Sequence, residues 1–346
     1  MQAVQFTDHG DTDVIEYGDF PDPVPAPDEV VVDVKAGALN HLDVWTRRGL
    51  PGFDLELPHV PGSDAAGVVE AVGEAVTRFE PGDRVAVTAG VSCGECEFCR
   101  DGEEATCVDF AIIGEHTRGV HSELAAVPED NLVAVPEGVD WQTAAAAPLV
   151  FQTAWRMLVT RADVRPGETV LVLGASGGVG HAAVQIATHA GTDVIATAST
   201  EAKLDHAREL GADHAINYEE RDFAEAVREH TGRRGVDVVV DHVGAATWRD
   251  SLAALAKGGR LVTCGATTGP SPETDIRRIF WNQLSVLGST MATPGEIDDV
   301  LPLVWDGTFE PHVRAVLPMS ETARAHELIE SREGFGKVVV VPDSEQ

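Results

Sequence analysis

Four of the chain's five cysteines have a spacing that could hold a metal ion. Cys93, Cys96, Cys99 and Cys107 follow the pattern C-x2-C-x2-C-x7-C within fifteen residues. Four thiolates complete the tetrahedral coordination of Zn²⁺ and leave no position for water or substrate, so the pattern predicts a structural zinc site. Two disulfides are the alternative, but no signal peptide opens the chain, and we expect reduced thiols. The fifth cysteine, Cys264, lies in an apolar run and is expected to be buried.

A second motif with chemical potential is the glycine-rich stretch Gly174-Ala175-Ser176-Gly177-Gly178-Val179-Gly180. Its glycines at 174, 177 and 180 lie between an apolar run at residues 170–173 and a helical pattern. A tight turn in that setting brings backbone N–H groups and a helix N-terminus to a pyrophosphate. The stretch therefore predicts a dinucleotide-binding turn.

The residues that follow the next expected strand bear on which dinucleotide binds. Where an NAD-binding fold places an acidic residue on the ribose hydroxyl, this chain has Ala198-Ser199-Thr200. Lys203 follows, and it is one of only four lysines in the chain. Without an acid to repel a 2′-phosphate and with a cation nearby, the stretch favours NADPH over NADH, although Lys203 could instead be a solvated helix residue.

The composition excludes several kinds of partner. The chain has 57 acidic and 25 basic residues among 346, a formal charge of −32, so binding to nucleic acid is not expected. No stretch approaches the ~20 apolar residues of a membrane span. Acidic residues are spread along the whole chain, which resembles adaptation to a high-salt cytoplasm in a halophile, and this dispersion argues against a localised acidic tail.

Two kinds of element must position these motifs. Up to about residue 150 the chain shows short alternating strands with Pro and Gly between them, at residues 30–34, 67–73 and 81–87, an all-β pattern. From about residue 166 strands alternate with helices, which predicts a doubly wound parallel sheet and hence an α/β fold. The expected strands are residues 170–173, 194–197, 216–218, 236–240, 261–263 and 286–287, and the expected helices are residues 182–189, 203–210, 223–230 and 247–255.

Five motifs, by their order along the chain and their spacing, resemble those of the medium-chain dehydrogenase/reductase superfamily, which contains zinc alcohol dehydrogenases and quinone oxidoreductases. They are the cysteine knuckle and residues 61–67, 81–85, 174–180 and 336–339. The resemblance covers nearly the whole chain. It implies a GroES-like β-barrel catalytic domain at residues 1–150 and 289–346, and a Rossmann NADP(H)-binding domain at residues 151–288. The active site would lie in the cleft between them.

The chain departs from the zinc alcohol dehydrogenases at the three ligands of their catalytic zinc. The early Cys position is Asn40, the Gly-His-Glu motif is Gly62-Ser63-Asp64, and the late Cys position is Leu149. An amide, a hydroxyl and an alkyl group are poor zinc ligands, so no catalytic zinc of the usual kind is expected. A rearranged site is the alternative, with ligands drawn from Asp43, Asp64, His41, His59 or His116.

Asn40 is also the residue that the zinc-free quinone oxidoreductases and enone or enoyl reductases carry at the early Cys position. By this resemblance Asn40 would be a polar donor in the cleft, His41 would contact the pyrophosphate or shuttle a proton, and Trp45 would wall the acceptor pocket. Trp45 could equally be a core residue. Asp43 and Thr153 complete the candidate catalytic set, and Thr153 matches the family's threonine beside the nicotinamide.

The resemblance also implies a set of cofactor contacts. Ser176, Gly177, Gly178 and Val179 would line the pyrophosphate; Ser199, Lys203 and Tyr218 would surround the adenosine phosphate, unless Tyr218 is simply packed. Lys337 would close the site from the returning segment. The ends of successive strands, which face ligand in an open α/β sheet, are expected at Val243, Gly265, Ala266, Thr267, Gly288, Ser289 and Thr290.

Three functions are consistent with these features. The first is an NADP(H)-dependent reductase of a quinone, enone or related conjugated carbonyl acceptor, with one structural zinc. The second is an alcohol dehydrogenase with non-standard catalytic metal ligands, and the third is a non-catalytic NADPH-binding regulator. We expect a cytoplasmic enzyme with a small-molecule substrate and no nucleic-acid or membrane partner. Family members commonly pair through their Rossmann sheets, which implies a homodimer or homotetramer formed near Val286.

Overall fold

The computed structural model describes residues 1–49 and 55–345, and these fall into two compact units. Unit 1 contains Met1–Leu149, Thr293–Glu333 and Lys337–Gln346, and unit 2 contains Val150–Ala292 and Gly334–Gly336. The chain thus leaves unit 1 once, returns to it, and later places three residues back in unit 2. None of the described helices has the length and apolar character needed to cross a lipid bilayer.

Unit 2 is built on a six-stranded parallel sheet with strand order β12-β11-β10-β13-β14-β15. This is the Rossmann order, and it confirms the predicted doubly wound sheet. The strands are β10 (Thr169–Val172), β11 (Asp193–Ala198), β12 (His214–Asn217), β13 (Val236–Val240), β14 (Leu255–Thr263) and β15 (Ser285–Gly288). The helices are α5 (Gly178–His189), α6 (Glu201–Glu209), α7 (Phe223–His230), α8 (Trp248–Ala254) and α9 (Ile276–Asn282).

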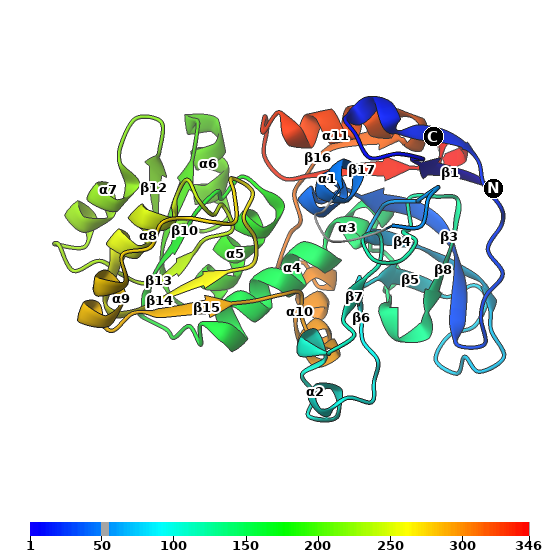
Figure 1. Ribbon diagram of the computed structural model, residues 1–346, viewed down its shortest axis with the longest axis horizontal. Helices are drawn as coiled ribbons and strands as arrows, with labels where there is room; N and C mark the ends of the chain where they lie inside the picture. Colours follow the sequence, from blue (N-terminus) through cyan, green and yellow to red (C-terminus); the bar gives the residue numbers. More distant parts are fainter. Residues whose placement is uncertain (50–54, 346) are drawn as a thin grey trace. The chain divides into compact units, whose positions relative to one another are not determined.

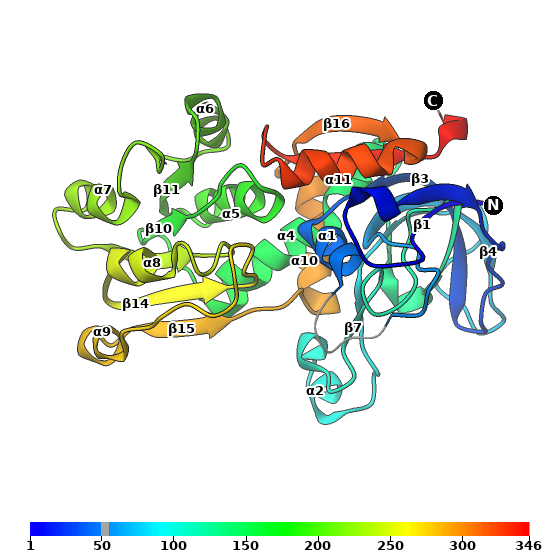
Figure 2. The same cartoon turned by 45° about the horizontal axis from the view of Figure 1, so that its top comes forward.

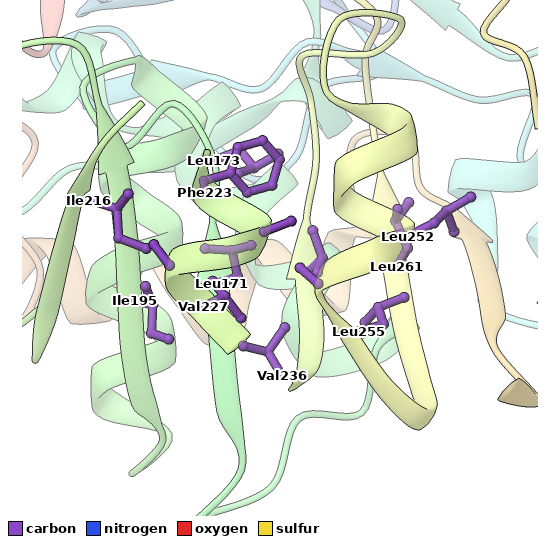
Figure 3. Packing of buried hydrophobic residues seen from close by; sticks show 14 of the residues in the cluster. Leu171, Leu173, Ile195, Ile216, Phe223, Val227, Val236, Leu252, Leu255 and Leu261 are labelled. Carbon is purple, nitrogen blue, oxygen red and sulfur yellow. The ribbon is translucent and has the colours of Figure 1, made fainter. Parts of the chain in front are cut away.

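The strand order also explains which helices cover which face of this sheet. From β10 the chain runs outward in one direction to β12 and then in the opposite direction to β15, so right-handed crossovers put α5 and α6 on one face and α7, α8 and α9 on the other. Figure 1 and Figure 2 show this arrangement. One buried cluster fills the face under α7 and α8 (Figure 3). Its larger members include Leu171, Leu173, Ile195, Ile216, Phe223, Val227, Val236, Leu252, Leu255 and Leu261.

Unit 1 contains a seven-stranded sheet that joins segments far apart in the sequence. Its order is β16-β17-β3-β4-β5-β9, with β8 also paired to β3. The strands are β3 (Glu29–Ala38), β4 (Asp64–Val72), β5 (Arg84–Val87), β8 (Leu124–Pro128), β9 (Leu132–Ala134), β16 (Val313–Pro318) and β17 (Lys337–Val341). Because β17 pairs with the end of β3, Val339 lies opposite Ala38. The C-terminal segment (red in Figure 1) therefore adds to a sheet begun by the N-terminal one.

Unit 1 also contains helices, so the all-β pattern inferred for the first 150 residues is incomplete. The strands β1 (Gln2–Gln5), β2 (Glu16–Asp19), β6 (Gly90–Val91) and β7 (Ala111–Ile112) form two further two-stranded sheets. The helices are α1 (His41–Arg48), α2 (Glu97–Arg100), α3 (Trp141–Ala146), α10 (Pro294–Trp305) and α11 (Thr322–Glu330). Helix α4 (Pro148–Trp155) contains the boundary between the units. Alanine-rich α3 packs its small side chains against the sheet, where Ala144, Ala145 and Ala146 are fully buried.

Candidate functional site

The four predicted cysteines lie together in unit 1, around the short helix α2. The Sγ atoms of Cys96 and Cys99 are 3.5 Å apart, as are those of Cys107 and Cys93, and Cys93 and Cys99 are separated by 3.9 Å. A tetrahedral zinc with Zn–S bonds of about 2.3 Å places its sulfurs roughly 3.8 Å apart. The four ligand atoms all lie within 4.8 Å of one another, so the cluster has the dimensions of a zinc site.

Backbone N–H groups support the sulfur atoms of this cluster. The Cys96 N–H donates to Cys93 Sγ at 3.4 Å, and the N–H groups of Cys93 and Asp109 donate to Cys107 Sγ at 3.3 and 3.4 Å. Such donors favour thiolate over thiol. Without a bound metal ion, backbone N–H groups of Cys99 and Val108 lower the pKa of Cys96 to about 6. Desolvation raises the pKa of Cys99 to about 12.

Asn40 begins helix α1 of unit 1, and Asp43 completes the cap. The N–H of Asn40 donates to Asp43 Oδ2 at 2.7 Å, and the two residues form a capping box. Both side chains are buried. An Asn followed three residues later by an acid is a sequence signal for such a helix start.

A buried polar network joins Asn40 to Asp64 and Lys337. The Asn40 Nδ2 donates to Asp64 Oδ2 at 2.8 Å, and Lys337 Nζ donates to Asn40 Oδ1 and, at 3.2 Å, to Asp64 Oδ2. The backbone N–H of Leu149 donates to Asp64 Oδ1 at 3.0 Å. The side chains of Lys337 and Asp64 are only 3% and 0% exposed. An ammonium ion therefore neutralises a carboxylate inside unit 1, in a setting where an unpaired charge would be very costly.

Burial dominates the acid–base behaviour of this network. Desolvation raises the pKa of Asp43 to about 7, against the hydrogen bond from the Asn40 N–H and the charge of Lys337. Desolvation also raises the pKa of Asp64, and Lys337, Asn40 and the Leu149 N–H oppose it. Asp43 can therefore carry a proton near neutral pH, next to an ion pair that is shielded from solvent.

The predicted glycine turn connects β10 to α5 in unit 2. Gly174 has a φ of +58°, a conformation that favours glycine, and a Cβ on Gly180 would lie 2.2 Å from the carbonyl oxygen of Gly174. Gly177, the N-cap of α5, is exposed. The twelve-residue helix thus directs its N-terminal N–H groups toward an open turn, the geometry that binds a pyrophosphate.

The residues predicted for the adenosine end lie where β11 and β12 end. Lys203 Nζ donates to Ser199 Oγ at 3.2 Å, and Thr200 caps α6 by accepting the Lys203 N–H. The N–H of Tyr218 donates to the carbonyl oxygen of Ala198, so Tyr218 lies beside the same strand end with its side chain exposed. The structure therefore brings Ser199, Lys203 and Tyr218 to one edge of the sheet.

The later strand ends lie at the same carboxyl edge. They carry the predicted residues Val243, Gly265, Ala266, Thr267, Gly288, Ser289 and Thr290. Asp241 also lies at this edge, although it was not among the predicted site residues. Its side chain is fully buried. It accepts hydrogen bonds from the Val243 N–H, from Thr247 Oγ1 and from Ser251 Oγ. Its only sequence signal is an acid at the end of an apolar strand.

Three further predicted residues occupy other places in the fold. Thr153 lies on α4, 5% exposed, and its Oγ1 is buried with no hydrogen-bond partner among the described residues. In unit 1 the ring of His41 meets that of Trp45 edge-on, with centroids 5.6 Å apart. The segment Gly334–Gly336 contacts the glycine turn in unit 2, where the Gly336 N–H donates to the carbonyl oxygen of Ser176 at 2.9 Å.

Comparison with known proteins agrees with these two units. The family described as alcohol dehydrogenase GroES-like domain matches residues 26–137, and the family described as zinc-binding dehydrogenase matches residues 178–306. A quinone oxidoreductase of Pseudomonas aeruginosa is 34% identical over 353 aligned positions, covering 99% of both chains. The chain belongs to the medium-chain dehydrogenase/reductase superfamily.

Other members of the superfamily are also similar to this chain. An acryloyl-coenzyme A reductase of Metallosphaera sedula is 33% identical over 329 positions, covering 94% of this chain and 96% of that enzyme. A solved structure of an NAD-dependent alcohol dehydrogenase is 46% identical with a TM-score of 0.95, covering 99% of both chains. The chain is accordingly an oxidoreductase of the medium-chain superfamily, and a nicotinamide cofactor is expected. The third function considered above, a non-catalytic regulator, does not fit these relatives.

In this medium-chain dehydrogenase/reductase, the three residues that the resemblance matched to catalytic zinc ligands make other contacts. Asn40 belongs to the buried network, and Ser63 Oγ donates to the carbonyl oxygen of Ile113 at 2.7 Å. Leu149 contributes only its backbone N–H, to Asp64. The residues present do not fit a zinc ion at these positions.

The residues of the alternative metal site are also engaged elsewhere. His59 Nε2 lies 3.1 Å from the carbonyl oxygen of Gly114, and the Ile112 N–H donates to His116 Nδ1. Within residues 1–49 and 55–345, two groups of three or more potential ligands lie close together. One is the cysteine knuckle, and the other is Asp193 with His214 and His230.

Proposed function

We propose that this enzyme transfers hydride from NADPH to a quinone, an enone or a related conjugated carbonyl compound, with one structural zinc and no catalytic zinc. The observation that carries this proposal is the buried Lys337–Asp64–Asn40 network. By the resemblance, Asn40 occupies the early ligand position of the zinc alcohol dehydrogenases, and Asp64 matches the acid that follows their histidine ligand. The cation of this network is the ammonium group of Lys337.

The chemistry of an ammonium ion favours a conjugated acceptor over a saturated alcohol. A zinc ion polarises an alcohol oxygen and lowers the pKa of what it binds, and no residue here replaces that Lewis acidity. Reduction of a conjugated carbonyl instead develops negative charge on an oxygen, which hydrogen-bond donors can stabilise. Lys337 would supply such a donor, because two of its three N–H groups are directed to Asn40 and Asp64 and the third is left for a substrate oxygen.

The cofactor-binding residues of unit 2 fit a phosphorylated dinucleotide. NADPH would supply the hydride. The backbone of Ser176, Gly177, Gly178 and Val179 would bind its pyrophosphate at the N-terminus of α5. The Ser199 hydroxyl and the Lys203 ammonium, 3.2 Å apart, would hold the 2′-phosphate. The hydroxyl of Thr153, which has no hydrogen-bond partner in the described part of the chain, is assigned to the nicotinamide end on the resemblance to the family.

A second candidate function, NAD-dependent alcohol oxidation, is favoured by one comparison. The chain is 46% identical to a structure of an NAD-dependent alcohol dehydrogenase. That function needs a catalytic zinc bound by residues other than Asn40, Ser63 and Leu149.

The two candidates are separated by an activity panel combined with metal analysis. We expect NADPH oxidation with 1,4-benzoquinone, cyclohexenone or acryloyl-coenzyme A, and no NAD⁺ or NADP⁺ reduction with saturated alcohols. Activity should survive a chelator for as long as the protein stays folded. Alcohol oxidation that is lost to the chelator before any unfolding would support the second candidate. The same result would overturn the first.

The exposed apolar surface at one edge of unit 2 suggests the oligomeric state. β15 is an edge strand, and α9 beside it exposes Ile276, Phe280 and Trp281 to 69%, 62% and 75%. We assign this surface to a homodimer contact, because an edge strand and large apolar side chains are rarely left uncovered. A Trp281→Glu variant should elute as a monomer in size-exclusion chromatography with light scattering.

The reduced knuckle thiols are consistent with a cytoplasmic location.

A further inference from the structure

Unit 2 contains a second group of metal-binding side chains, far from the cysteine knuckle in sequence and chemistry. Asp193, His214 and His230 each offer one ligand atom, and these atoms all lie within 4.8 Å of one another. His214 Nε2 is 3.7 Å from Asp193 Oδ1, and His230 Nε2 is 3.8 Å from Asp193 Oδ2. The two imidazole centroids are 3.5 Å apart.

The sheet register explains why these residues meet. His214 lies opposite Ile195 in the parallel pair β11–β12, and Asp193 precedes Ile195 by two residues. Because side chains alternate between faces with a period of two, Asp193, Ile195 and His214 point to the same face. Ile195 belongs to the cluster covered by α7, and His230 is the last residue of that helix. The starts of β11 and β12 and the end of α7 thus converge.

We propose that Asp193, His214 and His230 bind a divalent transition-metal ion, with Zn²⁺ as the ion to test. Two imidazole nitrogens and one carboxylate oxygen are a common ligand set for such ions, and three protein ligands leave room for water. Ligand atoms around a tetrahedral zinc lie about 3.4 Å apart, so the observed spacings require only small side-chain rotations.

A metal ion explains this arrangement better than two ion pairs do. If both imidazoles were protonated, two positive charges would lie in contact while sharing one carboxylate. A bound metal ion instead uses two neutral imidazoles together with the carboxylate. The three side chains are 34% to 42% exposed, so an ion can reach them from solvent.

The proposed site lies at the edge of the sheet opposite the cofactor turn. Asp193 and His214 are the first residues of their strands, whereas the glycine turn and Ser199 follow strand ends. The six residues of β11 separate the two edges by roughly 20 Å at about 3.3 Å per residue. The ion would therefore act as a cross-link among β11, β12 and α7 and would not take part in hydride transfer.

Zinc titration of the protein with its knuckle already loaded tests this site. We expect isothermal titration calorimetry to show one saturable Zn²⁺ site in the wild-type chain and a Zn²⁺-dependent rise in Tm. Asp193→Asn, which preserves side-chain size, should weaken binding at least about ten-fold, and the double variant H214A/H230A should abolish it. His206→Ala is the matched control, because it removes another imidazole of unit 2 that lies beside a carboxylate, Glu209 Oε2 at 3.1 Å.

The zinc titrations decide the proposal once the variants are shown to be folded. NADPH affinity and circular dichroism should be unchanged in D193N and H214A/H230A, because the site lies away from the cofactor turn. No saturable zinc binding beyond the knuckle would overturn the proposal. Binding of equal strength in the wild type, D193N and H214A/H230A would overturn it as well, and would place the second zinc elsewhere in the chain.

Discussion

Lys337 Nζ lies 3.2 Å from Asp64 Oδ2, and the two residues are 273 positions apart in the sequence. The contact joins the first residue of β17 to the first residue of β4, with both side chains almost fully buried. Asn40 completes the arrangement by donating to the same carboxylate oxygen. One ion pair therefore connects β17 to β4 inside unit 1.

Replacing Lys337 by methionine should strongly destabilise the protein. The change leaves Asp64 buried without its cation, and breaking one side of a buried pair costs about 3–5 kcal/mol. Chemical denaturation of the variant measures this loss. Lys35→Met is a suitable control, because Lys35 forms ion pairs with Asp33 and Glu345 in a more exposed setting and should cost less than about 1 kcal/mol. Equal losses for the two variants would show that the Lys337 pair is not desolvated.

The Asp43 carboxyl should make stability fall as the pH rises. Burial raises its pKa from 3.8 to about 7, so the folded chain holds a proton that the unfolded chain has already released. This contribution to stability is complete below about pH 4 and is lost as the pH rises through about 7. Asp43→Asn keeps an acceptor for the Asn40 N–H and carries no charge.

Unfolding free energies of the wild type and D43N at pH 5 and pH 8 measure this effect, because other titrating groups cancel in the difference. From pH 5 to pH 8 the wild type should lose roughly 2–4 kcal/mol relative to D43N. A difference that stays constant with pH would mean that Asp43 does not titrate in this range.

Local sequence patterns predicted the sheet of unit 2 well. α7 (Phe223–His230) and β13 (Val236–Val240) have the predicted bounds. A short apolar strand or an amphipathic helix can be recognised because its pattern of apolar residues lies within a stretch of about ten residues. The cysteine cluster could also be predicted from the local sequence, because all four cysteines lie within fifteen residues of one another. β14 begins at Leu255, earlier than expected, in a stretch that contains Gly258 and Gly259.

Contacts between distant segments could not be predicted in this way. Nothing in the sequence near Lys337 indicates that its ammonium is hydrogen-bonded to Asn40 and Asp64, and the resemblance implied that it closes the cofactor site instead. The convergence of Asp193 and His214 likewise depends on the register of two strands. Helix α1 was not predicted, because it is only eight residues long and mostly polar.

Lys203→Ala tests the preference for NADPH. Loss of a charge-assisted hydrogen bond of about 1.5–3 kcal/mol should weaken NADPH binding by roughly 10- to 100-fold, while NADH binding should hardly change. Fluorescence titration with both dinucleotides measures the two affinities. Lys257→Ala removes an exposed lysine from the same unit and should affect neither. If K203A weakened both dinucleotides equally, Lys203 would not contact the 2′-phosphate.

Cys96→Ser should reduce the zinc content without abolishing NADPH binding. Cys96 provides one of four sulfurs in unit 1, and the cofactor turn belongs to unit 2. Metal analysis should show substoichiometric zinc, and limited proteolysis should cut the chain near residues 93–107. Cys264→Ser, a change outside the knuckle, should retain the zinc of the wild type. Unchanged zinc in C96S would refute the four-thiolate site.

High salt should stabilise the protein by screening its own charge. With 57 acidic and 25 basic residues, the folded chain is crowded with like charges. The Debye length falls from about 10 Å at 0.1 M to about 3 Å at 1 M salt, so most of the rise in Tm should occur below 1 M KCl. Sucrose favours burial without screening charge and serves as the control. A Tm that rises evenly up to 3 M KCl would indicate salt exclusion from the surface, and a Tm independent of KCl would argue against adaptation to high salt.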